Sequence, residues 1–274
     1  MISEAAVKRL ARVQGVDPVV VDRDHALGVV LWAISTAAPG GAWVFKGGTC
    51  LRKCYYPDYR FSEDLDFTVV GSLRAREAEE LIARAAVASA SLGVRLLLEG
   101  LSTEVMDDEY GRESIEVRVP YQGALRMGSR PNIQFHLSAD EALAFAPNSR
   151  QLIHPYDDAA SLVASTPSYA LEEVLAEKMR AVSGQRRHPI ARDVYDIAQL
   201  LHRGDVDVGA ALAALPLKAQ RKNVDVRGAR ERFIEREAEY RVNWSQQLAY
   251  LVTDGMEFAA AFGAVAELLG RIGG

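Results

Sequence analysis

The stretch Phe45-Lys46-Gly47-Gly48-Thr49 decides the fold, because it carries a short apolar strand through a double glycine into a helix. We expect the strand over 42–45 and a helix that continues through Tyr55. A tight turn of this kind exposes backbone N–H groups at a helix N-terminus, where the helix dipole favours the negative charge of a phosphate. Thr49 can cap this helix or contact a phosphate oxygen. Glycine pairs also mark ordinary turns, so the motif indicates a phosphate loop only in combination with a second motif.

The second motif is the stretch Arg60-Phe61-Ser62-Glu63-Asp64-Leu65-Asp66-Phe67. It predicts a second strand over 65–70, in which alternation sends Asp64 and Asp66 to the same face. Leu65 and Phe67 then point to the other face, into the core. Two carboxylates about 7 Å apart repel each other unless a cation lies between them, and oxygen ligands of this kind suit Mg²⁺ that holds substrate phosphates. An exposed edge strand with solvated aspartates is the alternative, and the neighbouring glycine turn favours the metal site.

The remaining chain reads as an α/β half followed by a helical half. Pro18 and Asp22 introduce one helix in the first half. We expect its other elements as helices over 3–13 and 74–88 and short strands over 94–98, 114–120 and 132–137. After Thr166-Pro167 the apolar spacing becomes helical, with stripes over 171–182 and 191–201. The sequence therefore predicts an α+β core over 1–166 and a helical lobe over 167–274.

The composition is that of a globular protein, with 274 residues, 49% of them hydrophobic, 25% charged, and a net charge of −5. It excludes a disordered chain, and the net acidity argues against indiscriminate binding of nucleic acid. No stretch approaches the ~20 apolar residues of a membrane span, and no signal-peptide pattern is present. We expect a cytoplasmic protein with no membrane partner. Cys50 and Cys54 share one helix face, and we expect them to be packing residues rather than a disulfide or a metal site.

Charged residues in the helical half allow two interpretations each. Lys178 borders an apolar stripe, where a lysine either covers the core with its stem or points into a cleft. Asp193 and Asp196 share a face near a helix start, where they can simply compensate the helix dipole. A basic run has no acid within it and comprises Lys178, Arg180, Arg186, Arg187 and Arg192, and a second cluster comprises Lys218, Arg221 and Lys222. Such runs are solvated helix faces or, for the first of them, a surface that faces RNA.

Taken together, these motifs resemble the AbiEii-type nucleotidyltransferase toxins, the family that includes the MenT toxins of type IV toxin–antitoxin systems. The matching pieces are Lys46-Gly47-Gly48-Thr49-x-Leu51-x-Lys53, Arg60-x-Ser62-x-Asp64-Leu65-Asp66-Phe67, Glu177-Lys178 with Arg180, and Arg192-Asp193-x-Tyr195-Asp196-Ile197. Asp24 and the apolar stripe after it are similar to the family's N-terminal helix. The resemblance covers residues 20–202.

This resemblance implies a polymerase-β-like nucleotidyltransferase core with a helical C-terminal lobe. It also implies Mg²⁺-dependent transfer of a nucleoside monophosphate from an NTP to an RNA, at the 3′ end of tRNA, with a block of translation as the result and a cognate antitoxin as partner. Asp64 and Asp66 would bind the metal, and Asp64, Lys178 and Asp193 would be catalytic. The nucleotide would be held by Lys46, Gly47, Gly48, Thr49, Ser62 and Lys178.

One departure from this pattern concerns a later strand. Many nucleotidyltransferases carry a third carboxylate there, whereas the matching strand reads Ile133-Gln134-Phe135-His136. Either Asp193 takes that role or only one metal ion binds tightly. Two other functions stay open. The acceptor can be a protein hydroxyl or a small molecule, which the net acidity slightly favours. A catalytically inactive binding module is the other, and the intact acidic and lysine motifs count against it.

Overall fold

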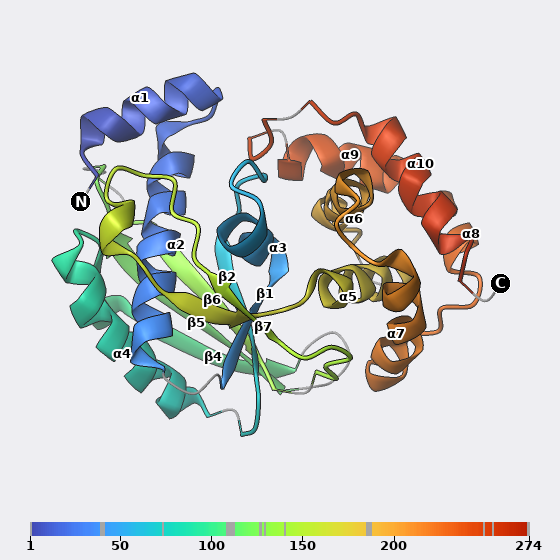
Figure 1. Cartoon of the computed structure of the whole chain (residues 1–274), viewed down its shortest axis with the longest axis horizontal. Helices are drawn as coiled ribbons and strands as arrows, with labels where there is room; N and C mark the ends of the chain where they lie inside the picture. The colour runs from blue at the N-terminus through green and yellow to red at the C-terminus, as the bar shows by residue number, and fades with distance from the viewer. Residues whose placement is uncertain are drawn as a thin grey trace. The chain divides into compact units, whose positions relative to one another are not determined.

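The computed structural model describes residues 2–38, 42–72, 74–107, 113–125, 128, 130–139, 141–184, 188–248, 250–253 and 255–272. The chain divides into two compact units, Met1–Asp140 with Pro147–Ser168, and Glu141–Ala146 with Tyr169–Gly274. The first contains the sheet and the second is helical (Figure 1). The predicted boundary at 166/167 lies inside the last strand of the sheet, and the division into a core over 1–166 and a helical lobe over 167–274 stays a prediction. In the described ranges, no helix is long and apolar enough to cross a membrane.

Among the described residues, an eight-stranded mixed sheet forms the centre of the first unit. Its strands are β1 (Trp43–Lys46), β2 (Asp64–Val69), β3 (Arg95–Leu96), β4 (Ser102–Asp107), β5 (Glu113–Gln122), β6 (Asn132–Ser138), β7 (Asn148–Gln151) and β8 (Ser165–Ser168). Their order is β3-β5-β6-β2-β1-β8-β7, and β4 pairs with β5 off this path. Because β2 pairs antiparallel with β1 and parallel with β6, the strand with the two aspartates is central.

The helices of the first unit are α1 (Glu4–Gln14), α2 (Pro18–Ala37), α3 (Gly47–Cys50), which continues into the π-helical turn η1 (Leu51–Tyr55), and α4 (Ala75–Ser91). Local chemistry sets their starts. Ser3 caps α1 by accepting a hydrogen bond from Ala6 N–H, and Asp17 caps α2 by accepting one from Val19 N–H. The helices predicted from apolar spacing are confirmed, with ends that differ by a few residues.

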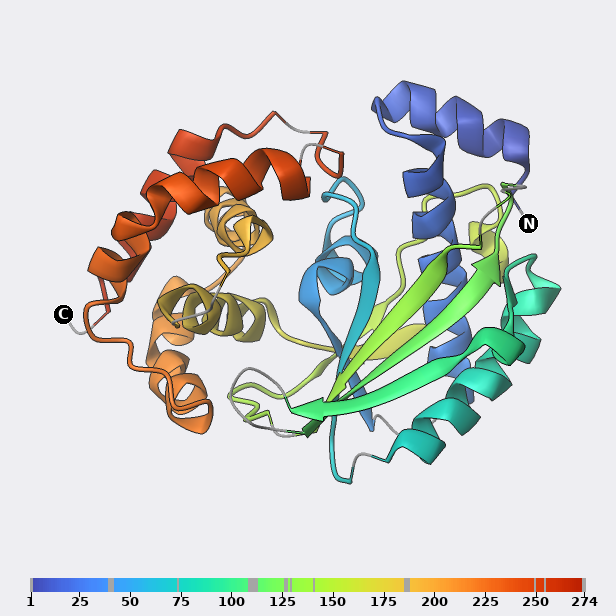
Figure 2. The same cartoon turned by 180° about the vertical axis from the view of Figure 1, so that it is seen from behind.

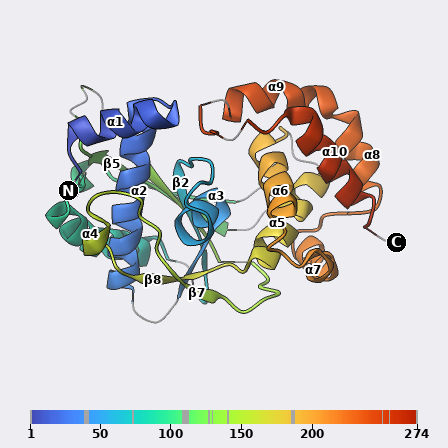
Figure 3. The same ribbon diagram turned by 45° about the horizontal axis from the view of Figure 1, so that its top comes forward.

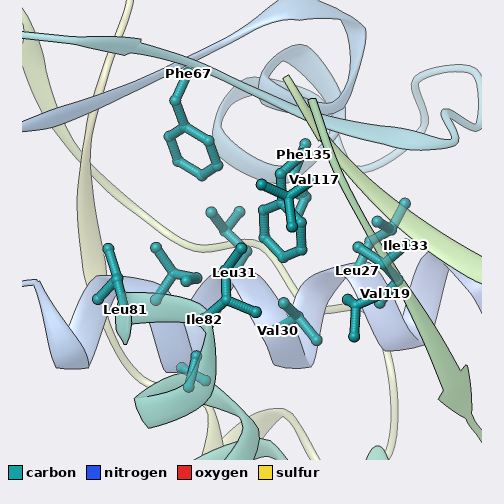
Figure 4. Close-up of a cluster of buried hydrophobic side chains, with 14 of the residues drawn as sticks. Leu27, Val30, Leu31, Phe67, Leu81, Ile82, Val117, Val119, Ile133 and Phe135 are labelled. Atoms are coloured by element: carbon teal, nitrogen blue, oxygen red, sulfur yellow. The ribbon is translucent and has the colours of Figure 1, made fainter. Parts of the chain in front are cut away.

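The main core of the first unit lies between the sheet and the helices α2 and α4, which pack side by side (Figure 2). Figure 4 shows Leu31 of α2 and Ile82 of α4 against Phe67 and Phe135 of the strands. These side chains are fully or almost fully buried, and each stabilises the fold by about 1.5–3 kcal/mol. Because Phe67 faces α2, the alternate residues of β2 point to the opposite face of the sheet.

The second unit consists of α5 (Leu171–Ser183), α6 (Ala191–Arg203), α7 (Val208–Arg221), α8 (Ala229–Glu235), α9 (Glu237–Leu248) and α10 (Phe258–Leu269). α5 packs against α6 and α7, and α10 packs against α6 and α8 (Figure 3). Stacked rings of Phe233 and Phe262, 4.3 Å apart, join α8 to α10. The segment 141–146 belongs to this unit because Ala144 and Phe145 N–H donate to Glu173, at 2.9 Å each.

The α+β class is confirmed, but three strands escaped prediction. The strands β4, β7 and β8 carry mostly polar residues, and all four residues of β7 are exposed, so no apolar alternation marks it. The strand predicted over 94–98 is shorter, Arg95–Leu96, and a 3₁₀ turn follows it. Cys50 and Cys54 are buried in the main core, as expected of packing residues.

Candidate active site

Asp64 and Asp66 lie on one face of the sheet, as predicted. Both are partly exposed, whereas Leu65 and Phe67 between and after them are fully buried. The register places Asp66 opposite Lys46 on β1 and opposite His136 on β6. The face therefore gathers charged groups from several strands, and we refer to it as the polar face, comprising Lys46, Asp64, Asp66, Glu116, Arg118, Gln134 and His136.

The Gly47 turn is built against the carboxylate of Asp66. Gly47 has φ 79°, in the left-handed region that favours glycine, and a Cβ added there would lie 2.2 Å from Asp66 Oδ2. Gly47 begins α3 directly after β1, so the first N–H groups of this helix lie beside the acidic pair. The glycine is thus required both by the turn and by the close approach of the aspartate. The double-glycine motif and the acidic motif, 17 residues apart at their glycine and first aspartate, form one structural element.

Gly48, Thr49 and Ser62 lie inside the structure around this turn. A Cβ on Gly48 would lie 2.4 Å from an Arg60 guanidinium nitrogen, so the arginine covers the glycine closely. Thr49 is buried, and its hydroxyl donates to the backbone carbonyl of Asp64 at 2.6 Å. Its hydroxyl therefore fixes the turn to β2, and α3 has no side-chain cap. Ser62, just before β2, is 9% exposed.

Lys46 is the last residue of β1, and its side chain reaches the end of β6. Its ammonium donates to Ser138 Oγ at 3.3 Å. Together with the register pairing to Asp66, this places a cation beside the acidic pair. A lysine in this position can contact a phosphate group without leaving the sheet.

Glu116 is a carboxylate of the polar face that sequence reasoning missed. Glu116 lies on β5, opposite His136 of β6, and is therefore in the same row as Asp66 of β2. Its Oε2 is 3.8 Å from His136 Nδ1. It also contacts the Arg118 guanidinium. The sequence showed His136 where an acid was expected on the adjacent strand, and the acid stands one strand further along. The alternation Glu116-Val117-Arg118-Val119 indicates which residues share a face of β5, but the row of Glu116 depends on the register of β5 against β6.

Gln134 connects Asp64 to Arg118 across β6. With its amide nitrogen toward Asp64, Gln134 donates to Asp64 Oδ1 at 2.9 Å and accepts from Arg118 Nε at 3.2 Å. This orientation satisfies both groups and orders the Asp64 carboxylate. By contrast, within the described part of the chain no hydrogen bond to the Asp66 carboxylate is present. Two carboxylates on one face, beside a helix start, are an oxygen donor set that fits Mg²⁺.

In the second unit, Lys178 joins the two helices that carry the later motifs. Its ammonium lies 2.6 Å from Asp193 Oδ1 and 2.8 Å from Asp196 Oδ2. The Lys178 and Asp193 side chains are 14% and 10% exposed, and Asp196 is fully buried. The side chain of Lys178 extends from α5 to α6. Lys178 and Asp193, which were both predicted to be catalytic, therefore form one ion pair. The role of Asp196 as a second partner was not predicted.

Several described residues of the two basic runs are buried. Arg180 is 4% exposed and pairs with Glu177. Lys218 is 2% exposed and pairs with Glu173 and Glu177. Lys222 is also buried, whereas Arg221 is exposed. Spacing alone could not show this, because their acidic partners come from other turns and helices. Arg186 and Arg187 lie outside the described residues.

The fold of this chain is similar to that of a known class of enzyme. The structure of MenT4, a nucleotidyltransferase toxin from Mycobacterium tuberculosis H37Rv, matches with a TM-score of 0.68 and 23% identity, over 99% of this chain and 90% of that chain. The two proteins share the nucleotidyltransferase-toxin fold. No curated protein matches the sequence.

The sequence matches a family described as "Nucleotidyl transferase AbiEii toxin, Type IV TA system" over residues 29–267. The chain belongs to this family, and the resemblance stated from the motifs is confirmed. Membership makes the protein a nucleotidyltransferase with an NTP as substrate, and it implies an antitoxin as partner. The match extends beyond residue 202, where the motif-based resemblance ended.

Proposed function

We propose that the protein transfers a nucleoside monophosphate from an NTP to the 3′ end of a tRNA, with Mg²⁺ held by Asp64 and Asp66. The observation that carries the proposal is the close contact of the Gly47 turn with the Asp66 carboxylate. A Cβ added to Gly47 would lie 2.2 Å from Asp66 Oδ2. A phosphate-binding turn and an acidic pair in contact can serve one triphosphate. Transfer to tRNA would explain a toxin, because a modified 3′ end stops the tRNA from working in translation.

In the proposed reaction, the 3′-hydroxyl oxygen of the RNA forms a bond to the α-phosphorus of the NTP. The bond between the α-phosphorus and the bridging oxygen breaks, and pyrophosphate leaves with that electron pair. The hydroxyl proton passes to a carboxylate of the polar face, which we assign to Asp64. Its amide neighbour Gln134 orients that carboxylate at 2.9 Å. When bound, Mg²⁺ would neutralise phosphate charge and align the reacting oxygens.

The residues around the turn would hold the triphosphate. Backbone N–H groups of Gly47, Gly48 and Thr49 would donate to phosphate oxygens. Thr49 would contribute its N–H group and not its hydroxyl, because the hydroxyl donates to the backbone carbonyl of Asp64. Lys46 would add a positive charge from the end of β1, and Ser62 a hydroxyl from the loop before β2. These roles are supported by the placement of the residues around one turn.

Lys178 and Asp193 would act from the second unit. Lys178 would contact the triphosphate and stabilise the charge that develops on pyrophosphate. Asp193 would hold the lysine in position through the 2.6 Å ion pair. An ammonium between two carboxylates keeps its charge while a phosphate oxygen approaches, so the pair supports an electrostatic role for both residues.

A second acceptor stays in consideration because of the buried basic residues. Arg180, Lys218 and Lys222 are paired or buried inside the second unit and are not available to RNA phosphates. With a net charge of −5, the chain offers little non-specific attraction to RNA. A protein hydroxyl or a small molecule is therefore the second candidate acceptor for the same chemistry.

The test is incubation of the purified protein with total cellular RNA, a cell extract and each of the four α-³²P-labelled NTPs in turn, with Mg²⁺ or with EDTA. The proposal predicts label in the tRNA band, sensitive to ribonuclease and dependent on Mg²⁺. Periodate oxidation of the RNA destroys the 3′-terminal diol, so pretreated RNA should take up no label. Asp64→Asn protein is the inactive control.

The same gel separates the alternatives. Label that survives ribonuclease but not protease would assign a protein acceptor. Label in neither polymer, with pyrophosphate still released, would assign a small molecule. No label and no pyrophosphate under any condition would contradict an active nucleotidyltransferase and favour the inactive binding module.

A further inference from the structure

A buried cluster of two histidines and one aspartate lies apart from the polar face. His25 comes from α2, and His154 and Asp158 come from the segment that joins β7 to β8. His25 and His154 are 1% and 8% exposed as whole residues, and the Asp158 side chain is 6% exposed. His25 and Asp158 are 133 positions apart in the sequence, so the fold brings this group together.

The two histidines converge on the Asp158 carboxylate, each at a different oxygen. Asp158 accepts both histidines, with His25 Nε2 at 3.0 Å from Oδ2 and His154 Nε2 at 3.1 Å from Oδ1. One ligand atom from each residue lies within 4.8 Å of the others. Ligands held at about 2.0–2.1 Å around a tetrahedral zinc ion are separated from each other by roughly 3.3 Å. The observed nitrogen–oxygen separations are close to that edge length.

Hydrogen bonding inside the cluster is incomplete. In the described ranges, His25 Nδ1 and His154 Nδ1 are buried and make no hydrogen bond. Each ring is therefore held by a hydrogen bond at one nitrogen only. Burial lowers the pKa of both imidazole rings.

The charged groups near the cluster are paired among themselves. Asp24 lies 2.7 Å from the Lys53 ammonium and also accepts from Arg52 at 2.7 Å. Asp22 accepts hydrogen bonds from backbone N–H groups of the segment after β5.

We propose that His25, His154 and Asp158 bind one divalent transition-metal ion of the zinc class, which ties α2 to the segment between β7 and β8. Imidazole ligands favour zinc, iron, nickel and copper over magnesium. The burial of all three ligands closes the site to substrate, which indicates a structural ion. Gly28 makes room for the site, because a Cβ there would lie 2.5 Å from His154 Nδ1.

This ion is distinct from the Mg²⁺ of the proposed function. α2 packs against the face of β2 that carries Leu65 and Phe67, and Asp64 and Asp66 point to the other face. The two sites also differ in chemistry, with two nitrogen ligands in one and carboxylates alone in the other. The inference therefore does not depend on nucleotide transfer.

The experiment uses the full chain, purified with EDTA and then dialysed free of chelator. Zinc is added and measured by elemental analysis and by competition with a chromogenic chelator, and the melting temperature is followed in parallel. We expect one zinc per chain, retained in millimolar Mg²⁺. At a hundredfold excess over Kd, the melting temperature should rise by roughly 5–10 °C.

Two single variants, His154→Asn and Asp158→Asn, should lower the zinc content from about one to near zero and abolish the rise in melting temperature. His202→Asn, an exposed histidine of α6, is the matched control and should bind as wild type does. Asp64→Asn should also keep one zinc. Equal zinc content in His154→Asn and wild type would overturn the proposal.

A crystal of the zinc-treated wild-type protein keeps the test decisive if the ligand variants do not fold. Anomalous scattering at the zinc edge should place one peak among His25, His154 and Asp158. A peak elsewhere, or stoichiometric binding with no peak there, would overturn the proposal. Wild-type protein that binds no zinc after refolding in its presence would do the same.

Discussion

Lys178 Nζ lies 2.6 Å from Asp193 Oδ1, so the lysine of α5 and the first aspartate of α6 are one electrostatic unit. Asp196 completes it at 2.8 Å and is fully buried. From the sequence, Lys178 was expected to contact the triphosphate and Asp193 to be a catalytic acid, as if they acted separately. Their contact means that a change in one alters the other. The two aspartates, by contrast, can be distinguished by experiment.

We expect Asp193→Asn to reduce nucleotide transfer and Asp196→Asn to reduce stability. Asp196 is the deeper partner, so its replacement should lower the stability by about 1–3 kcal/mol while transfer below the melting temperature stays within about threefold of wild type. Asp193→Asn should reduce transfer by about 100-fold or more, because the lysine loses its orientation. Thermal unfolding and single-turnover labelling measure the two quantities. If both variants lost activity to the same degree, the separate role of Asp193 would be wrong.

Asp66→Asn should abolish transfer, with a loss on the order of 10³-fold, and leave the metal-free fold intact. Its removal relieves repulsion between two carboxylates, so the melting temperature in EDTA should stay level or rise. Glu63→Gln is the matched control, because Glu63 precedes the strand and pairs with Arg23 at 2.5 Å on a partly exposed surface. It should retain activity. Labelling with Mg²⁺ and calorimetry in EDTA are the measurements, and an active Asp66→Asn protein would remove the metal assignment.

Gly47→Ala should damage activity more than backbone strain alone explains. An alanine at φ 79° costs about 1–2 kcal/mol, and its methyl group would in addition displace the Asp66 carboxylate, 2.2 Å away. Gly15→Ala provides the control, because Gly15 has φ 69° and nothing within 4 Å of its would-be Cβ. Both variants should lose similar stability in urea unfolding. Transfer should fall at least tenfold in Gly47→Ala only, and equal activities would separate the turn from the site.

The sequence sufficed for the central part of the site because its signals are local. The alternation of Asp64, Leu65, Asp66 and Phe67 gives the face of each residue, and the double glycine marks the turn beside them. Glu116 could not be found in this way, because its row in the sheet depends on the register of β5 against β6. A register is set by pairing over long sequence distances, and spacing within one strand does not contain it.

The charge pattern of the helical half misled for a related reason. A run of basic residues on the sequence says nothing about which acids lie opposite, and for Lys178 and Lys218 those acids come from neighbouring helices. Lys218 of α7 reaches Glu173 on α5, 45 positions earlier in the chain. Glu173 also accepts the N–H groups of Ala144 and Phe145. Burial of a lysine of this kind follows from tertiary packing, which the local pattern of charges does not reveal.

Lys218 should therefore be a residue of stability and not of RNA binding. Lys218→Met removes the cation that faces Glu173, whose side chain is 1% exposed, and leaves that carboxylate uncompensated. Loss of one partner of a buried pair costs about 3–5 kcal/mol, so the melting temperature should drop by roughly 6–20 °C. Transfer by the folded variant at low temperature should equal that of wild type.

Arg221→Met is the matched control on the same helix, because Arg221 is exposed. It should change the melting temperature by less than about 4 °C, since exposed charges contribute about 0–1 kcal/mol. The measurements are calorimetry and the KM for tRNA of both variants. A Lys218→Met protein with wild-type stability but a raised KM for tRNA would return this lysine to the acceptor surface. The double variant with Glu173→Gln should recover part of the lost stability, because it removes the uncompensated charge that makes the single change costly.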